Sequence, residues 1–271
     1  MACPCSIEHF VTSNFIQWEI DTMSFKNYSS IYITSLTSKD YSQLKTFNEQ
    51  YDILYIQTIN MDNFDLISNE PDLYRSLQTR FNLHQEYINT ETLYPLFYDL
   101  LIRLKPKLQS QLDVYTHRSS GLLCAQIRTD RNLTFPNHAV FPYYEKPITK
   151  VLEFLKSKQS SNTKILVTTD SQDVQQLVQR MLPAHYLVQI ISPITHIAQY
   201  SNYSSCESLG KAIIEFHLLA ECDLIITLKS SFGYFAVMRR EDPFKKLFLY
   251  CYGLIQIHNT DDYNKYTYST C

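Results

Sequence analysis

The chain has 271 residues, of which 45% are hydrophobic and 19% are charged, and its formal net charge is −3. This hydrophobic content allows a sizeable core and argues against global disorder. The small negative charge provides no basic field, so we expect no nucleic acid as a partner. Only 4 glycines occur, where usual frequencies predict about 19. No GxGxxG or Walker A loop is present, which argues against dinucleotide-binding enzymes of the usual kind and P-loop NTPases.

Residues 1–118 are rich in Tyr, Asn, Asp and Thr. Short strands are expected at Ser30–Leu36 and Asp52–Ile59. Apolar residues at helical spacing predict a helix over Thr92–Pro106, with the final proline marking its end. The polar segment Lys107–Ser120 is interpreted as a helix end followed by a linker. This part of the chain is treated as a first domain.

Residues 119–271 alternate apolar strands with helices more clearly. The expected strands are Gly121–Arg128, Lys164–Thr169, Tyr186–Ile191, Asp223–Leu228 and Lys245–Cys251. The expected helices are Tyr143–Lys158, Asp170–Leu182, Cys206–Cys222 and Ser230–Arg240. Such alternation predicts a parallel sheet covered by helices on both faces.

Seven cysteines are present, and none forms a CxxC pair, so we expect no zinc site. Cys124 and Cys222 lie in or beside apolar runs and are interpreted as small core residues. Asp261 and Asp262 are adjacent in a polar C-terminal segment and make a weak metal motif. We therefore expect no metal.

No apolar run approaches the roughly 20 residues of a transmembrane helix. Glu8 lies where a signal peptide would need an apolar stretch. The chain as given is thus expected to be soluble, or to be a luminal part without its anchor. Sequons at Asn27, Asn132 and Asn202 give weak support for the secretory route, because roughly two would arise by chance.

Polar side chains fall where three expected strands end. Arg128 ends the first strand, Asp170 follows the second, and Ser230 and Ser231 follow the fourth. Ligands of parallel sheets bind outside the carboxyl ends of the strands. A helix beginning at the two serines offers free N–H groups to an anion, and a guanidinium fork suits a phosphate. The alternative is that Ser230 only caps a helix and Arg128 only makes a surface ion pair.

Three segments carry a family resemblance in order: "LLCAQIRTD", "KILVTTDSQDV" and "GKAIIEFHLLAECDLIITLKSSFGYFAVMRR". They resemble the motifs of the GDP-fucose-dependent fucosyltransferase superfamily. The segments "AQIR" and "SSFGYFA", with "KKLFLY" shortly after, are most similar to the motifs of plant-type xyloglucan and galactoside 2-alpha-L-fucosyltransferases. The resemblance covers Gly121–Cys251, about half of the chain.

The resemblance implies a GT-B-like α/β fold, with two Rossmann-like halves that have parallel sheets and a reduced N-terminal half. Residues 1–118 would form the acceptor-side half and residues 119–271 the GDP-sugar-binding half. The implied reaction transfers L-fucose from GDP-fucose to a glycan hydroxyl, that of a galactoside, with inversion. It requires neither a metal nor another cofactor. The implied location is the Golgi lumen, and the implied partners are a GDP-sugar and a glycan acceptor.

Arg128 takes the catalytic role in this resemblance, because it would balance the charge that develops on the leaving GDP. Ser230, Ser231 and Phe232 would shape the phosphate turn. Glu215 would contact the nucleoside, and Asp170 would lie near the guanine or the ribose. The donor-binding set that the resemblance implies is Arg128, Asp170, Glu215, Ser230, Ser231 and Phe232.

The chain also departs from the family pattern. Many fucosyltransferases have a histidine and two adjacent arginines in the first motif, where this chain has Gln126, a single Arg128 and then Thr129. The segment "VMRREDPF" replaces a glycine-rich helix, and the N-terminal part lacks the glycine-rich loop and the acceptor-site motifs expected there. Asp130, His138 and Glu145 are candidates for the catalytic base by location only.

Two other readings remain open. The chain could be a catalytically inactive nucleotide-sugar or glycan-binding protein on the same fold. It could also be an unrelated parallel α/β enzyme, such as a phosphate-binding hydrolase.

Overall fold

The computed structural model of the chain forms two compact units, which consist of Ser13–Leu101 and of Met1–Thr12 with Ile102–Cys271. The residues that it describes are 9–15, 30–33, 53–56, 75, 78–79, 90–116, 121–129, 145–192, 194, 206–228 and 230–268. Each unit is described by itself.

The smaller unit contains the two strands that were predicted near the N-terminus, and both are shorter than predicted. Strand β2 (Ser30–Ile33) pairs in parallel with β3 (Ile53–Ile56). Helix α4 (Thr90–Leu101) begins two residues before the predicted start and contains Pro95 in its second turn, where the missing N–H removes one intrahelical hydrogen bond.

The predicted end of this helix at Pro106 is wrong, because Pro106 instead begins a second helix, α5 (Pro106–Thr116). A short strand, β4 (Ile102–Leu104), separates the two helices and pairs with β1 (Val11–Ser13). Proline suits the first position of a helix, since the N–H that it lacks would have no intrahelical partner there. Leu108 and Leu112 lie one turn apart and are buried, so this segment is a packed helix and not a linker.

The larger unit is built on a six-stranded sheet with the order β10-β9-β8-β5-β6-β7. Its strands are β5 (Leu122–Ile127), β6 (Lys164–Thr169), β7 (Leu187–Val188), β8 (Leu224–Thr227), β9 (Leu247–Tyr250) and β10 (Leu254–Ile257). All neighbouring pairs are parallel except the β9–β10 pair, which is antiparallel. In chain order the first five strands are therefore arranged 3-2-1-4-5, the Rossmann order. The predicted α/β class with parallel sheets is confirmed.

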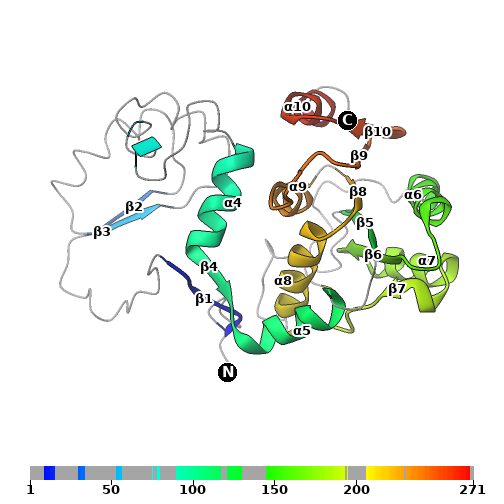
Figure 1. Ribbon diagram of the computed structural model, residues 1–271, viewed down its shortest axis with the longest axis horizontal. Helices are drawn as coiled ribbons and strands as arrows, with labels where there is room; N and C mark the ends of the chain where they lie inside the picture. The colour runs from blue at the N-terminus through cyan, green and yellow to red at the C-terminus, as the bar shows by residue number, and fades with distance from the viewer. Residues whose placement is uncertain are drawn as a thin grey trace. The chain divides into compact units, whose positions relative to one another are not determined.

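Helices cover both faces of this sheet, as Figure 1 shows. The helices of the larger unit, besides α5, are α6 (Glu145–Lys158), α7 (Gln172–Met181), α8 (Cys206–Ala220), α9 (Ser231–Met238) and α10 (Thr260–Tyr268). Helices α6 and α7 pack on one face, where Leu123, Ala125 and Ile127 of β5 join their apolar residues in one core cluster. Side chains alternate along a strand, so Cys124 and Gln126 face the opposite layer, where α8 packs against α9 and α5.

The interpretation of Cys124 and Cys222 as ordinary core residues is wrong in one respect. Both are buried, but they form a disulfide with a Cα–Cα distance of 6.0 Å. The bond joins the middle of β5 to the turn between α8 and β8. The register of β5 and β8 brings this turn next to Leu122, whose carbonyl accepts a hydrogen bond from the Asp223 N–H at 2.8 Å. Cys206 and Cys251 are also disulfide-bonded.

The end of the chain carries two elements that the sequence did not predict, β10 and α10. Strand β10 returns antiparallel to β9 after a tight turn in which Tyr252 has a φ of 54°. Asp261 and Asp262 lie in the first turn of α10, where carboxylates favour the helix dipole. Tyr263 of α10 packs against Tyr234 of α9, with a ring-centroid distance of 4.5 Å. The segment around Asp261 is therefore a docked helix and not a polar tail.

Compact packing places α5 with the larger unit, although the sequence put it before the proposed boundary at residue 118. The assignment of an acceptor-side half and a donor-binding half stays a prediction.

Among the described residues, no helix combines the length and the apolar character needed to cross a bilayer.

The disulfide yields a prediction about stability. It closes a loop across a sequence separation of 98 residues, and loops of this size gain about 3–5 kcal/mol from a cross-link. The double variant Cys124→Ala/Cys222→Ala should therefore unfold at a clearly lower urea concentration than the wild type. Peptide mapping without reductant should recover the linked pair from the wild type. An unchanged urea midpoint, or recovery of both cysteines as free thiols, would contradict the prediction.

Candidate functional site

The sheet has a topological switch point between its two central strands, β5 and β8. The chain leaves β5 toward α6 on one face, and it leaves β8 toward α9 on the opposite face. Gln126 of β5 lies beside Thr227 of β8, and the Leu228 N–H donates to the Gln126 carbonyl at 3.2 Å, so the pairing continues past β8. Crevices at such points are the usual ligand sites of open α/β sheets. Arg128 follows β5 at this point and is half-buried.

Helix α9 begins at this same edge of the sheet. Ser230 is its N-cap residue, with extended backbone angles of φ −157° and ψ 122°, and its carbonyl accepts the Tyr234 N–H at 3.0 Å. Its hydroxyl makes no capping hydrogen bond, although the residue is only 6% exposed. Ser231 is the first helical residue and is exposed. The first N–H groups of a helix have no intrahelical acceptor, so this end is suited to an anion.

A row of buried polar side chains crosses three strands below this helix. Thr168 of β6, Gln126 of β5 and Thr227 of β8 are register partners, so they point to the same face of the sheet. The side-chain oxygens of these three residues and of Ser230 have no hydrogen-bond partner among the described residues. Each unpaired buried group costs about 1–3 kcal/mol, so four at one edge indicate a site arranged for a ligand or for bound water.

Gly233 in the first turn of α9 permits the helix to come this close to the strands. A Cβ atom at this position would lie 2.9 Å from Gln126 Oε1 and 3.1 Å from Thr227 Cγ2. Both distances are shorter than ordinary van der Waals contact. The absence of a side chain at Gly233 is thus what sets the start of α9 directly on the row of Gln126 and Thr227.

Asp170 lies at the end of β6 and contacts the residue that follows Arg128. Its Oδ1 atom accepts hydrogen bonds from the Thr129 N–H at 2.8 Å and from the Thr129 hydroxyl at 3.1 Å. The next residue, Ser171, caps α7 by accepting the Val174 N–H at 3.4 Å. The structure therefore brings Asp170 and Arg128 together through Thr129.

Phe232 packs into the interface between α9 and α8. Its ring makes an edge-to-face contact with the Phe216 ring at a centroid distance of 5.4 Å. The Arg239 guanidinium lies over the Phe216 ring, with Cζ 5.7 Å from the ring centroid. Arg239 also approaches His217 Nδ1 at 3.2 Å. Burial, with a further contribution from the Arg239 charge, lowers the pKa of His217 to about 3, so its neutral ring accepts this hydrogen bond. These contacts fix α9 against α8.

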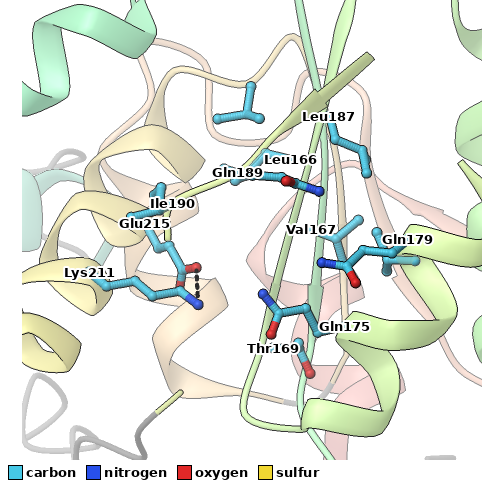
Figure 2. A pocket seen from close by; sticks show the side chains of 12 residues that line it. Leu166, Val167, Thr169, Gln175, Gln179, Leu187, Gln189, Ile190, Lys211 and Glu215 are labelled. Carbon is cyan, nitrogen blue, oxygen red and sulfur yellow. Dashed lines mark ion pairs between the residues drawn. The ribbon is translucent and has the colours of Figure 1, made fainter. Parts of the chain in front are cut away.

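Glu215 lies on α8 and lines a pocket that opens to solvent. Figure 2 shows Lys211 and Glu215 on one side of this pocket, opposite Gln175 and Gln179 of α7. Residues of β6 and β7 complete its lining. Arg128, Asp170, Ser230, Ser231 and Phe232 are not among its lining residues, whereas Thr169, which precedes Asp170, is.

Lys211 and Glu215 form an ion pair at 3.7 Å in which both side chains are largely buried. Lys211 Nζ also donates to the Ser192 carbonyl at 3.4 Å. Burial raises the pKa of Glu215 from 4.5 to about 7, and the Lys211 charge opposes that rise. The carboxyl group is therefore protonated in part of the molecules at neutral pH.

Sequence reasoning missed the polar row, Thr129, Lys211 and Gly233. The threonines at the ends of "KILVTT" and "DLIITL" were the available signal, since a hydroxyl at the end of an apolar strand needs a partner. Among the proposed bases, Asp130 and His138 lie outside the described residues. Glu145 begins α6, and its side chain is likewise not described. No group of three or more metal-binding side chains occurs in the described part of the chain.

Comparison with known proteins gives structural neighbours but no sequence match. The sequence matches no protein-family model and no curated protein. The chain is similar to a mutant of Arabidopsis thaliana FUT1 in complex with GDP, at 17% identity and a TM-score of 0.49, with 82% of this chain and 50% of that chain covered. It thus spans about half the length of the FUT1 chain.

Two further solved structures are of NodZ. One is the alpha-1,6-fucosyltransferase soaked with GDP-fucose, at 14% identity and a TM-score of 0.45, covering 82% of this chain and 64% of that chain. The other is fucosyltransferase NodZ from Bradyrhizobium, at 13% identity and a TM-score of 0.37, covering 89% and 70%. Because the three TM-scores are below 0.5, the likeness by itself defines neither the fold nor the activity of this chain.

The contact at Gly233 gives a prediction about packing. Gly233→Ala should lower the free energy of unfolding by about 1–3 kcal/mol, because the new methyl group pushes α9 away from β5 and β8. Gly253→Ala is the matched control, since a Cβ there meets no atom within 4 Å. Urea denaturation of both variants measures the difference. Equal stabilities would show that α9 does not depend on the close approach to Gln126.

The buried Glu215 gives a prediction about pH. Its raised pKa means that the unfolded chain loses this proton first, so stability falls as the pH rises from about 4.5 to about 7. Glu215→Gln should abolish that fall, so the stability of the variant relative to the wild type should rise by up to about 3 kcal/mol between the two ends of this range, on top of a pH-independent cost of leaving the buried Lys211 unpaired. Glu207→Gln, at an exposed position on the same helix, is the control. Parallel pH profiles for wild type and Glu215→Gln in thermal unfolding would contradict the prediction.

Proposed function

We propose that this chain is a GDP-fucose-dependent glycosyltransferase that transfers L-fucose from GDP-fucose to a hydroxyl of a galactoside-containing glycan. The single observation that carries the proposal is the joint placement of Arg128 and the start of α9 at the switch point between β5 and β8. The residues there are those of the first and last motifs that resemble the fucosyltransferases. We place the chain in that superfamily, with the plant-type 2-alpha-L-fucosyltransferases as the nearest group.

The diphosphate of the donor would bind between Arg128 and Ser231. The guanidinium group offers two parallel donors to phosphate oxygens, and such charge-assisted pairs are the stronger hydrogen bonds of proteins. The free N–H groups at the start of α9 add a positive dipole end. The Ser230 hydroxyl is buried without a partner among the described residues, and a phosphate oxygen would satisfy it.

The same groups would favour the chemical step. When the bond from fucose to the diphosphate breaks, negative charge accumulates on the leaving GDP. Arg128 and the N-terminus of α9 are fixed groups that favour this charge, so the proposed reaction needs no metal or other cofactor. An acceptor hydroxyl attacks from the opposite side of the sugar, which inverts its configuration, and its proton passes to a base, for which Asp130, His138 and Glu145 are the candidates. The nucleoside would extend toward Glu215 and the pocket between α7 and α8.

The disulfides support a location in the secretory pathway. Cys124 and Cys222 are linked, and Cys206 and Cys251 are disulfide-bonded as well. Disulfides form and persist in oxidising compartments. We therefore propose the Golgi lumen as the place of action, with glycosylation of the sequon asparagines as a consequence.

Calorimetry with GDP tests the donor site. Wild type should bind GDP, and Arg128→Ala should bind it about 10- to 100-fold more weakly, because one charge-assisted contact is lost. Arg180→Ala removes an exposed arginine on α7 and should leave the affinity unchanged. Equal affinities of wild type and Arg128→Ala, or no binding of GDP by wild type, would overturn the proposal.

Release of GDP from GDP-fucose in the presence of a galactose-terminated oligosaccharide tests the transfer. Wild type should release GDP and form a fucosylated product in buffer that contains a chelator. Donor binding without any transfer to galactosides or other glycans would favour the alternative of an inactive nucleotide-sugar-binding protein.

A further inference from the structure

The carboxylate of Asp170 is already engaged within the protein. Oδ1 accepts two hydrogen bonds from one residue, the Thr129 N–H at 2.8 Å and the Thr129 hydroxyl at 3.1 Å. Thr129 is only 4% exposed, so solvent cannot readily replace a lost acceptor there. Removing the carboxylate would leave a buried N–H and a buried O–H without their partner, which proteins avoid.

These bonds complete a set of constraints on both sides of Arg128. On one side, Ile127 is the last residue of β5 and lies in register with Thr169 of β6. On the other side, Thr129 is tied to Asp170, which follows β6. The backbone at Arg128 is therefore held at two adjacent points by the same neighbouring strand and the turn after it.

The turn that carries Asp170 is itself well fixed. The Ser171 N–H donates to the Thr169 hydroxyl at 3.1 Å, and Ser171 Oγ accepts the Val174 N–H at the start of α7. Val174 is completely buried in the core between α7 and the sheet. The packing of α7 in the core thus fixes the position of Asp170, and the hydrogen bonds from Thr129 to Asp170 fix Thr129 in turn.

We propose that Asp170 is a positioning residue for Arg128 and does not contact the nucleoside. Its carboxylate oxygen holds the backbone after β5, so that the Arg128 guanidinium starts from a fixed Cα position at the diphosphate site. This inference rests on the proposed function for its effect on GDP, whereas the contact with Thr129 exists without any ligand. A side chain that starts from a fixed backbone position loses less conformational entropy when it binds a ligand.

Calorimetry with GDP on a set of variants tests the role. Asp170→Ala should weaken GDP binding about 10-fold, while Asp170→Asn, whose amide oxygen still accepts both hydrogen bonds, should stay within about 3-fold of wild type. In the Arg128→Ala background, Asp170→Ala should cause no further loss, since the two residues act through one contact. Asp173→Ala removes an exposed carboxylate from the first turn of α7 and should not change the affinity.

Additive losses from Asp170→Ala and Arg128→Ala, or a loss in Asp170→Asn as large as in Asp170→Ala, would show direct contact of the charged carboxylate with the ligand and overturn the inference. Should Asp170→Ala fail to fold, Thr129→Val replaces it. That variant loses only the hydroxyl donor and should bind GDP about 3-fold more weakly, and Thr129→Ser should restore the affinity. Unchanged binding by Thr129→Val would also count against the inference.

Hydrogen exchange without ligand separates this inference from the proposed function. The Thr129 amide should exchange about 10-fold faster in Asp170→Ala than in wild type, and at the wild-type rate in Asp170→Asn. Equal exchange in Asp170→Ala and wild type overturns the positioning role, whatever GDP does. If wild type does not bind GDP, the proposed function fails, and exchange at Thr129 then decides whether Asp170 holds the backbone at Arg128.

Discussion

The parallel pairing of β5 with β8 is the constraint on which the rest of the site depends. It places Gln126 beside Thr227. The pairing extends one residue beyond β8, because the Leu228 N–H donates a hydrogen bond to the Gln126 carbonyl. Because the two strands lead to helices on opposite faces, their ends form the kind of edge at which open α/β sheets usually bind ligands. The disulfide from Cys124 to Cys222 also links β5 to the turn that precedes β8. The site thus lies beside two strands that are held together by a parallel ladder and by a nearby disulfide.

Stability and function are in tension at this edge. Polar side chains lie near the ends of three largely apolar strands, at Thr168, Gln126 and Thr227, and their oxygens have no partner within the described part of the chain. A protein selected only for stability would fill such a row with Val or Ile. Gly233 adds to this tension, since it gives up helix propensity so that α9 can lie on the row. Both features are explained if a ligand with its own polar atoms completes the site.

The second polar centre differs from this row because its two residues, Lys211 and Glu215, pair with each other. The two charges pair within one helix and are largely buried, so each depends on the other for compensation. Burial dominates for Glu215 and raises its pKa toward neutrality. The pocket beside it is lined by amides of α7, which can donate and accept hydrogen bonds without adding charge. Such a lining suits a neutral group with several hydrogen-bonding atoms better than a second anion.

The sequence by itself determined the alternation of strands and helices in residues 121–251 and the strand-end positions of Arg128, Asp170 and Ser230. Hydrophobic periodicity and the one-sided chemistry of parallel strand ends suffice for both. Only the tertiary structure decided that Asp170 bonds Thr129, that the Ser230 hydroxyl leaves α9 uncapped, that Cys124 and Cys222 are linked, and that Pro106 starts a helix. The bond from Thr129 to Asp170 and the disulfide depend on which residues, distant in the chain, meet in space, and a local pattern does not contain that information. Pro106 is compatible with the end of one helix or the start of the next, and the burial of Leu108 and Leu112 decided between the two.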